Sequence, residues 1–554
     1  MITKEDLTNL IFPDITRTIE DLELIYPKRN LKEGAQVTRF APSPTGFLHT
    51  GSLFTAMVAS KVAKDSEGIF YLRLEDTDTK REIEGSALKL VEQLRTFNIL
   101  PNEGYLIDES KSNNHGPYKQ SERRDIYRTV IKYMILNDLA YPCFASEEDL
   151  NKLREEQTAK KEITGYYGKY AIYRDLPIEE AYNKIKNGEK YVIRFKSKGN
   201  HENKIKVHDE IRGDLLLTEN DQDIVILKSD GLPTYHFAHA VDDHSMRTTL
   251  ITRGEEWLPS LPLHIEMFKA LGFKAPKYAH LPVIMKLDEG KRRKLSKRKD
   301  PEASVDYFLE QGYEPYSLLV YLMTIANSNY EDFLVSQKDY NLDHFKFSLK
   351  KMSLDGALFD NDKLSFYAKE ILSKMKKEEI ASKSYKWAKK YDQRLKEFIE
   401  KDYSRYEIIL NIEREKKNPR KDYAKYSDIY EAIKFFDNDE YLKLLNNGFN
   451  FNPSIDKNII KEFLNQYKNY IDLSNDESSW YNKIKECAAK FNFCADMKAY
   501  KTDPNGYIGS INDACEIVRI VMSGRKVTPN LFAILNILTK EEAINRIDLV
   551  ISRL

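Results

Sequence analysis

Apolar and polar positions alternate along the chain from Ala35, and this pattern predicts two strands with a helix between them. The run AQVTRF (35–40) has strand period, a loop rich in proline and glycine follows it, and residues from Ser52 to about Lys64 have helical spacing. The apolar run GIFYLRL (68–74) predicts the second strand, which ends in the acidic sequence EDTD. This order is a βαβ unit, and open parallel sheets bind ligands at the carboxyl ends of their strands.

Strand-like runs return after a more mixed region at about 113–219. They are DIVILKSDGLPTYHFAHAVDD (223–243), TTLITRGEEWL (248–258) and YAHLPVIMKLD (278–288). The simplest arrangement is one parallel sheet that an insertion interrupts. After Lys299 the apolar residues recur at helical spacing, so we expect the second half of the chain to be all-helical. Residues 1–34 form a short amphipathic lead-in.

The length of 554 residues is too great for one hydrophobic core and predicts roughly three to five domains. Apolar residues make up 41% and charged residues 31%, which is typical of a folded protein. No apolar run approaches the roughly 20 residues of a membrane span. The first residues lack the basic lead and the continuous apolar stretch of a signal peptide, so we place the protein in the cytoplasm.

Four cysteines without a C-x-x-C pair argue against both a disulfide framework and a zinc knuckle. The formal net charge is zero, so a nucleic-acid surface would depend on where the charges lie. The stretch KRRKLSKRK (291–299) is almost wholly basic, and residues 374–425 mix Lys and Arg with Tyr and Trp. Such runs are usually solvated faces, so by themselves they identify no partner.

The loop PSPTGFLHTGS (42–52) has features of a phosphate site. Its prolines keep it out of helical conformation, and Gly46 and Gly51 let the backbone approach a ligand closely. Ser52 opens a helix whose unpaired N–H groups and dipole favour an anion, and His49 can donate a hydrogen bond to a phosphate oxygen. The alternative is a loop whose histidine merely caps the helix.

A second motif, KLSKR (294–298), places two lysines, a hydroxyl and an arginine close to Gly290. Such a loop could close on a triphosphate and neutralise the charge that develops on leaving pyrophosphate. A solvated basic loop, or a contact to nucleic-acid phosphates, would have the same composition.

The pair HTGS and KLSKR resembles the two signature motifs of class I aminoacyl-tRNA synthetases. The segments TRFAPSPTGFLHTGS, LRLEDTD, GPYKQSER, DGLPTYHFAHAVDDH and TRGEEWL resemble those of bacterial-type glutamyl-tRNA synthetase, and similarity continues through FSLKKMSLDGALFD to SGRKVTPNLFAILNILTKEEAINRI. The resemblance covers nearly the whole chain apart from the first thirty-odd residues.

The resemblance implies a glutamate pocket and an ATP site. In the glutamate pocket the Arg39 guanidinium would pair with the substrate side-chain carboxylate, and Glu75 would hold the α-ammonium group. The pocket residues are Arg39, Ala41, Ser43, Glu75, Tyr235, His239 and Arg253. The ATP site residues are Thr45, His49, Gly51, Ser52, Glu256, Lys294, Ser296 and Lys297. His49, Lys294 and Lys297 would act in catalysis by stabilising the pentacoordinate phosphorus.

Several positions depart from the family pattern. Ser52 stands where this family usually has glycine, Thr50 where isoleucine is common, and His239 at the place of an asparagine that contacts the amino acid. Some members bind zinc through cysteines in the insertion, but here the matching segment retains Cys143 alone, so we predict no structural zinc. The run Asp242, Asp243 and His244 looks like a metal triad, but consecutive residues of an extended chain cannot all face one ion.

The implied fold is a Rossmann-type α/β parallel-sheet catalytic domain with an α+β insertion, followed by an all-helical C-terminal half. After the lead-in, the expected regions are the catalytic halves at 35–112 and 220–299, an insertion for the tRNA acceptor end at 113–219, a stem-contact domain at 300–370 and a helical anticodon-binding region at 371–554. The implied reaction joins glutamate to tRNA(Glu) and uses ATP with Mg²⁺. The resemblance also implies that the enzyme is a monomer. The sequence leaves open whether tRNA(Gln) is charged too.

Three other functions are alternatives to a glutamyl-tRNA synthetase. A glutaminyl enzyme usually reads PEPNG in the first motif and has a β-barrel-like anticodon module, whereas this chain reads PSPTG. A shorter paralogue that glutamylates a modified tRNA base lacks the anticodon region, which the helical portion after about residue 370 provides here. An inactive tRNA-binding regulator on the same scaffold is disfavoured because both signature motifs retain their charged members.

Overall fold

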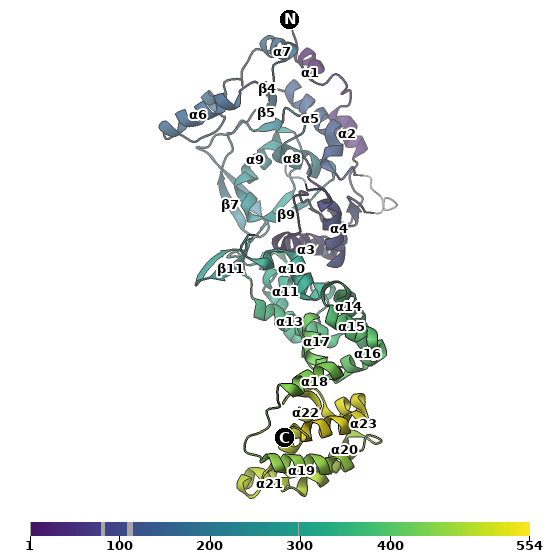
Figure 1. Ribbon diagram of the computed structural model, residues 1–554. Coiled ribbons are helices and arrows are strands. Elements are labelled where there is room, and N and C mark those ends of the chain that lie inside the picture. The colour runs from purple at the N-terminus through teal and green to yellow at the C-terminus, as the bar shows by residue number, and fades with distance from the viewer. Residues whose placement is uncertain (1, 79–82, 108–114, 297) are drawn as a thin grey trace. The chain divides into compact units, whose positions relative to one another are not determined.

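The computed structural model describes residues 2–78, 83–107, 115–296 and 298–554. The chain divides into two compact units, a first unit of Met1–Tyr307 with Leu319–Asp360 and a second unit of Phe308–Leu318 with Asn361–Leu554 (Figure 1). The helices α10 (Val305–Gln311) and α11 (Pro315–Ala326) begin in one unit and end in the other.

The first unit combines helices with several sheets. Its helices are α1 (Lys4–Ile11), α2 (Ile19–Ile25), α3 (Thr50–Asp65), α4 (Ser86–Thr96), α5 (Arg124–Leu136), α6 (Glu147–Ala159), α7 (Ile178–Lys186), α8 (Tyr235–Ser245), α9 (Leu261–Ala270) and α12 (Asn329–Gln337). Its strands are β1 (Val37–Phe40), β2 (Ile69–Leu72), β3 (Glu103–Gly104), β4 (Ala140–Cys143), β5 (Val192–Phe195), β6 (Lys204–Asp209), β7 (Gly213–Thr218), β8 (Val225–Leu227), β9 (Leu250–Gly254), β10 (Lys277–Leu281), β11 (Ile284–Asp288), β12 (Lys291–Lys294) and β13 (Ala357–Leu358).

Parallel strands form the centre of this unit, as the sequence pattern predicts. Strand β1 pairs with β2, and β2 pairs with β3, all in parallel. Strand β9 pairs in parallel with β10, and the backbone N–H of Thr249 donates to the Val37 carbonyl at 3.0 Å, which brings the start of β9 beside β1. Because β1 alternates, Thr38 bonds to the Ala59 carbonyl of α3 while Arg39 faces α8 from the opposite side of the sheet.

The region at 113–219 contributes to two different sheets. Strands β4, β5 and β8 form an antiparallel sheet, which has α6 and α7 in the connections between its strands. The hairpin β6–β7 instead joins the parallel strands, because Asp209 of β6 is the register partner of Tyr278 in β10. The strands therefore form two sheets, β1–β2–β3 and β7–β6–β10–β9, and the single parallel sheet expected from the sequence is wrong in this respect.

The prediction of a strand over 223–243 is wrong for most of that run. Strand β8 covers Val225–Leu227 alone, and the residues from Tyr235 onward form helix α8. The helix is buried almost all round, including its polar residues, so its sequence shows no amphipathic period. Asp242, Asp243 and His244 accordingly lie on a helix and not in an extended chain.

The second unit is rich in helices and contains one short strand pair among its described residues. Its helices are α13 (Asn361–Lys374), α14 (Lys377–Tyr391), α15 (Gln393–Lys401), α16 (Tyr403–Asn411), α17 (Ser427–Ile433), α18 (Asn438–Asn446), α19 (Lys457–Tyr467), α20 (Glu477–Ala489), α21 (Met497–Thr502), α22 (Ile511–Ser523) and α23 (Leu531–Ile551, interrupted at Thr539). The strand pair is β14 (Phe493–Cys494) with β15 (Gly509–Ser510). None of the helices described in either unit has the length and apolar character needed to cross a membrane.

Candidate active site

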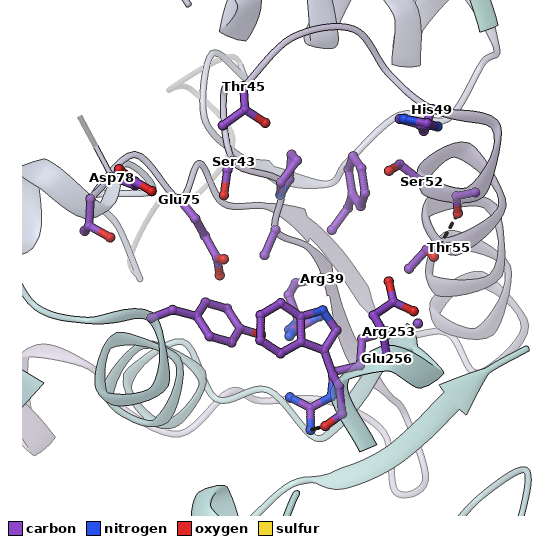
Figure 2. Close-up of a pocket in the computed structure, with 18 of the residues that line it drawn as sticks. Arg39, Ser43, Thr45, His49, Ser52, Thr55, Glu75, Asp78, Arg253 and Glu256 are labelled. Carbon is purple, nitrogen blue, oxygen red and sulfur yellow. Dashed lines mark hydrogen bonds between the residues drawn. The ribbon is translucent and has the colours of Figure 1, made fainter. Parts of the chain in front are cut away.

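A large cavity opens in the first unit at the carboxyl ends of β1, β2, β9 and β10. Its volume is about 1310 Å³. Figure 2 shows His49 and Ser52 at the start of helix α3 on one side of it, Glu75 on the other, and Arg39 between them. Twelve of the predicted site residues line this cavity: Arg39, Ala41, Ser43, Thr45, His49, Gly51, Ser52, Glu75, Tyr235, Arg253, Glu256 and Lys294.

The first signature motif forms the start of helix α3. His49 has extended backbone angles (φ −84°, ψ 152°), and Thr50 is the first helical residue, two positions before the predicted start. In the part of the chain that the structure describes, the His49 side chain makes no capping bond to this helix, so the capping role considered from the sequence does not apply. The first-turn N–H groups of a helix have no acceptor within the helix and favour an anion.

The first motif is attached to the segment that follows the basic motif. The Thr50 hydroxyl donates to the Glu302 carbonyl at 2.6 Å, and the Val305 N–H donates to the Leu48 carbonyl at 3.3 Å. His49 and Ser304 form an antiparallel bridge between these two contacts. Two motifs about 245 residues apart in sequence thereby line the same cavity.

Within the basic motif, Lys294 ends strand β12, is exposed and lines the cavity. Ser296 is half-buried and lies outside the lining, and its backbone N–H donates to Asp300 Oδ2 at 2.8 Å. Arg293 binds the same carboxylate through two N–H groups at 2.6 and 2.8 Å, which lowers the pKa of Asp300. Lys297 lies outside the described residues.

Arg39 belongs to a buried cluster of opposite charges. Its Nε lies 3.2 Å from Asp243 Oδ1, and Arg73 Nη1 lies 2.9 Å from the same oxygen. Burial alone would raise the pKa of Asp243, but the two guanidinium groups outweigh burial and hold it well below its usual value. The sequence does not reveal this arrangement, because Asp243 and Arg73 meet Arg39 from distant parts of the chain.

Glu75 completes this charge cluster on the cavity side. One of its oxygens accepts a hydrogen bond from Arg73 Nη2 at 2.9 Å. Burial nevertheless raises the pKa of Glu75 above its ordinary value. A cationic group bound in the cavity would oppose that shift and stabilise the carboxylate.

Aromatic rings form one wall of the cavity. The Tyr235 and Trp257 rings have centroids 4.3 Å apart, and both residues line the cavity. His239 is fully buried and is absent from the lining that the described residues form. Its ring stacks on Tyr235 at 5.9 Å, and its Nδ1 lies 2.8 Å from Asp243 Oδ2. The structure thus places His239 next to the cavity wall and not in contact with the cavity.

Arg253 has a different set of neighbours from Arg39. Its Nε donates to His280 Nε2 at 3.0 Å, its Nη1 lies 3.1 Å from His264 Nδ1, and its Nη2 donates to the Trp257 carbonyl at 3.4 Å. Among the described residues these acceptors are uncharged, so the positive charge of Arg253 is available to a ligand. Sequence reasoning missed both histidines, and their buried strand and helix positions gave no signal of this role.

The described residues contain no group of three or more His, Cys, Asp or Glu side chains arranged to hold a metal ion. Cys143 is buried, and its Sγ lies 3.4 Å from the Tyr166 hydroxyl. Asp242 of the apparent metal triad instead pairs with Arg123 at 2.6 Å. The absence of structural zinc stays a prediction from the sequence.

Residues 36–366 match the family described as tRNA synthetases class I (E and Q), catalytic domain, and residues 509–551 match an anticodon binding domain. The glutamate–tRNA ligase of Clostridium perfringens (strain 13 / Type A) is 44% identical over 543 residues, which covers 98% of this chain and 100% of that protein. The glutamate–tRNA ligase of Acetivibrio thermocellus is 43% identical over 542 residues and covers 98% of each chain.

A solved structure is similar over nearly the same length. It is the crystal structure of a glutamate tRNA ligase from Elizabethkingia meningosepticum CCUG26117 in complex with its amino acid. The TM-score is 0.73 at 27% identity, over 93% of this chain and 99% of that one.

Proposed function

Because the chain belongs to the class I tRNA synthetases for glutamate and glutamine, we propose that its cavity activates glutamate with ATP and transfers it to tRNA(Glu). One observation carries this proposal. The HTGS turn, Lys294 and the Arg39–Glu75–Arg253 pocket line a single cavity, although they come from three separate parts of the chain.

The pocket residues have the charges that glutamate requires. Arg39 and Arg253 are two buried guanidinium groups that can bind carboxylates, and Glu75 is a carboxylate that can hold an ammonium group. Neutral glutamine would leave one guanidinium without its anionic partner, which gives a physical basis for preferring glutamate. Ala41 and Ser43 line the same cavity, and His239 contacts Tyr235 from the protein interior.

In the first step, the α-carboxylate of glutamate attacks the α-phosphorus of ATP, which enters as its Mg²⁺ complex. The bond from this phosphorus to the bridging oxygen breaks, so pyrophosphate leaves and glutamyl-adenylate forms. The start of α3 with His49 and Ser52, together with Thr45 and Lys294, would bind the phosphates and stabilise the charge of the transition state. The reaction requires positioning and charge stabilisation, and it needs no nucleophile from the protein.

In the second step, a ribose hydroxyl of the terminal adenosine of tRNA attacks the adenylate carbonyl, and AMP leaves. We expect the 2′-hydroxyl to be the attacking group. The insertion at 113–219 is proposed to hold the acceptor end, and the helical region at 371–554, which contains the matched anticodon binding domain, to hold the anticodon. We further propose that the enzyme is a monomer. Charging of purified tRNA(Gln) beside tRNA(Glu) tests whether it uses both tRNAs.

The proposal is tested by glutamate-dependent exchange of pyrophosphate into ATP with tRNA present and absent. We expect exchange with glutamate, little with glutamine, and dependence on tRNA. Lys294→Ala should slow exchange by roughly 10²–10³-fold, because one preorganised charge next to the phosphates is lost. Lys291→Ala is the matched control, since Lys291 is exposed on the same strand β12 and lies outside the cavity lining.

Two results would contradict the proposal. An enzyme that exchanges with glutamine in preference to glutamate would be a glutaminyl-tRNA synthetase. Absence of both exchange and charging, with tRNA binding intact, would indicate the inactive regulator.

A further inference from the structure

Behind Arg253, three neighbouring strands carry a line of buried polar side chains. Arg253 lies on β9, its register partner His280 lies on β10, and Asp209 ends β6 on the far side of β10. Arg253 Nε donates to His280 Nε2 at 3.0 Å, and His280 Nδ1 lies 2.7 Å from Asp209 Oδ2. Asp209 and His280 have no exposed surface, and Arg253 is 5% exposed, toward the cavity.

The contacts of Asp209 fix the tautomer of His280. Asp209 Oδ1 accepts the backbone N–H groups of Ile211 and Arg212 at 3.0 and 2.9 Å, and Oδ2 accepts the backbone N–H of His280 at 3.0 Å. Because this carboxylate acts as an acceptor throughout, the proton of the His280 ring must lie on Nδ1. The lone pair on Nε2 then accepts from the guanidinium of Arg253.

Burial also lowers the pKa of His280, although Asp209 opposes the shift, so the ring is neutral at physiological pH. A direct carboxylate partner would neutralise Arg253 and compete with a bound anion. A neutral imidazole between the two groups orients the guanidinium without removing its charge.

We propose that Asp209 and His280 are positioning residues that orient the Arg253 guanidinium for a substrate carboxylate. This inference rests on the proposed function, in which Arg253 belongs to the glutamate pocket. It predicts that a change at Asp209, which does not line the cavity, alters glutamate binding more than ATP binding or turnover.

The test is steady-state charging of tRNA(Glu) by Asp209→Asn. An asparagine cannot accept at both oxygen positions. Either its amide N–H₂ faces Ile211 and Arg212, or it faces His280 Nδ1 and forces the ring proton toward Arg253. We expect the KM for glutamate to rise roughly 10–100-fold, with kcat and the KM for ATP changed less than about threefold.

A matched control lies on the same hairpin. His208 Nδ1 lies 2.7 Å from Asp214 Oδ1, but both side chains are exposed and outside the cavity lining. Asp214→Asn therefore removes an equivalent histidine–carboxylate contact, and it should leave the KM for glutamate unchanged.

A second pair of variants tests the inference if Asp209→Asn does not fold. In His280→Gln the side-chain oxygen can accept from Arg253 while the amide donates to Asp209, so this variant should keep a KM for glutamate near that of the wild type. His280→Leu retains bulk but loses both bonds, so its KM should rise as in Asp209→Asn.

The inference is overturned if Asp209→Asn leaves the KM for glutamate unchanged, or if His280→Gln and His280→Leu raise it equally. It is also overturned if glutamate KM, ATP KM and kcat deteriorate together, because that pattern indicates a purely structural role. Failure of the proposed function is distinguishable, since the wild-type protein itself would then show no glutamate-dependent charging.

Discussion

At the scale of single residues, burial determines the protonation state of His239, which stands where the family has asparagine. Its Nδ1 lies 2.8 Å from Asp243 Oδ2, and its Nε2 lies 3.2 Å from the Tyr278 hydroxyl. Burial lowers the pKa of His239 to about 3, so the ring stays neutral near pH 7. A histidine in place of the family's asparagine therefore adds volume next to Tyr235 without adding a charge to the pocket.

This burial has a predictable effect on the free energy of unfolding. Between pH 6.5, the ordinary pKa of histidine, and about pH 3, the unfolded chain binds a proton at His239 that the folded chain does not. The free energy of unfolding should therefore fall with falling pH, by roughly 1.4 kcal/mol per unit from this group. His239→Asn should remove that part of the slope in urea denaturation at neutral and mildly acidic pH. Equal slopes for the wild type and His239→Asn would contradict the prediction.

At the scale of elements, the sequence predicted the βαβ start correctly because β1 lies in a run with strand period, β2 is a short apolar run and α3 follows a proline-rich loop. It failed at α8, where a buried helix lacks the polar face that would reveal its period. Through the family resemblance it also identified Arg39, Glu75 and Arg253 as pocket candidates, but it did not predict the contacts that Asp243, Asp209 and His280 make with them. Those three act through partners on other strands or helices, and such pairing has no local sequence signature.

Thr50, which stands where the family commonly has isoleucine, connects the first signature motif to the segment after the second through the hydrogen bond from its hydroxyl to the Glu302 carbonyl. Thr50→Val keeps the shape of the side chain but removes the 2.6 Å bond to the Glu302 carbonyl. We expect a loss of about 1–2 kcal/mol in stability and a roughly tenfold slower pyrophosphate exchange, because the segment after Lys294 is held less firmly beside α3.

Thr38→Val is the control for the Thr50 prediction. Thr38 also buries a hydroxyl that donates to a backbone carbonyl, that of Ala59 at 2.8 Å, but it connects β1 to the middle of α3. It should lose similar stability and retain the exchange rate. If both variants slow pyrophosphate exchange equally, the claim that the Thr50 hydrogen bond holds the two motifs together is wrong.

At the scale of the whole molecule, the sequence predicted an amphipathic lead-in but not the surface that it covers. Leu7 of α1, Phe12 directly after α1 and Leu22 of α2 are buried in a core shared with α5, α8 and α9. Arg29 Nε also donates to the Met246 carbonyl at 3.0 Å, immediately after α8. An apolar face in a sequence indicates that something covers it, but the partner surface is assembled from distant segments and cannot be read locally.

The lead-in should therefore stabilise the first unit, which Phe12→Ala tests. Phe12 is 2% exposed, so its truncation leaves a cavity and should cost roughly 3–5 kcal/mol in the unfolding of this unit. Leu24→Ala is the control in the same lead-in, because Leu24 is 80% exposed and should contribute little. In scanning calorimetry we expect Phe12→Ala to lower the transition of the first unit and leave that of the second unit in place. A lead-in that merely lies on the surface would instead give the same transition temperatures for both variants and the wild type.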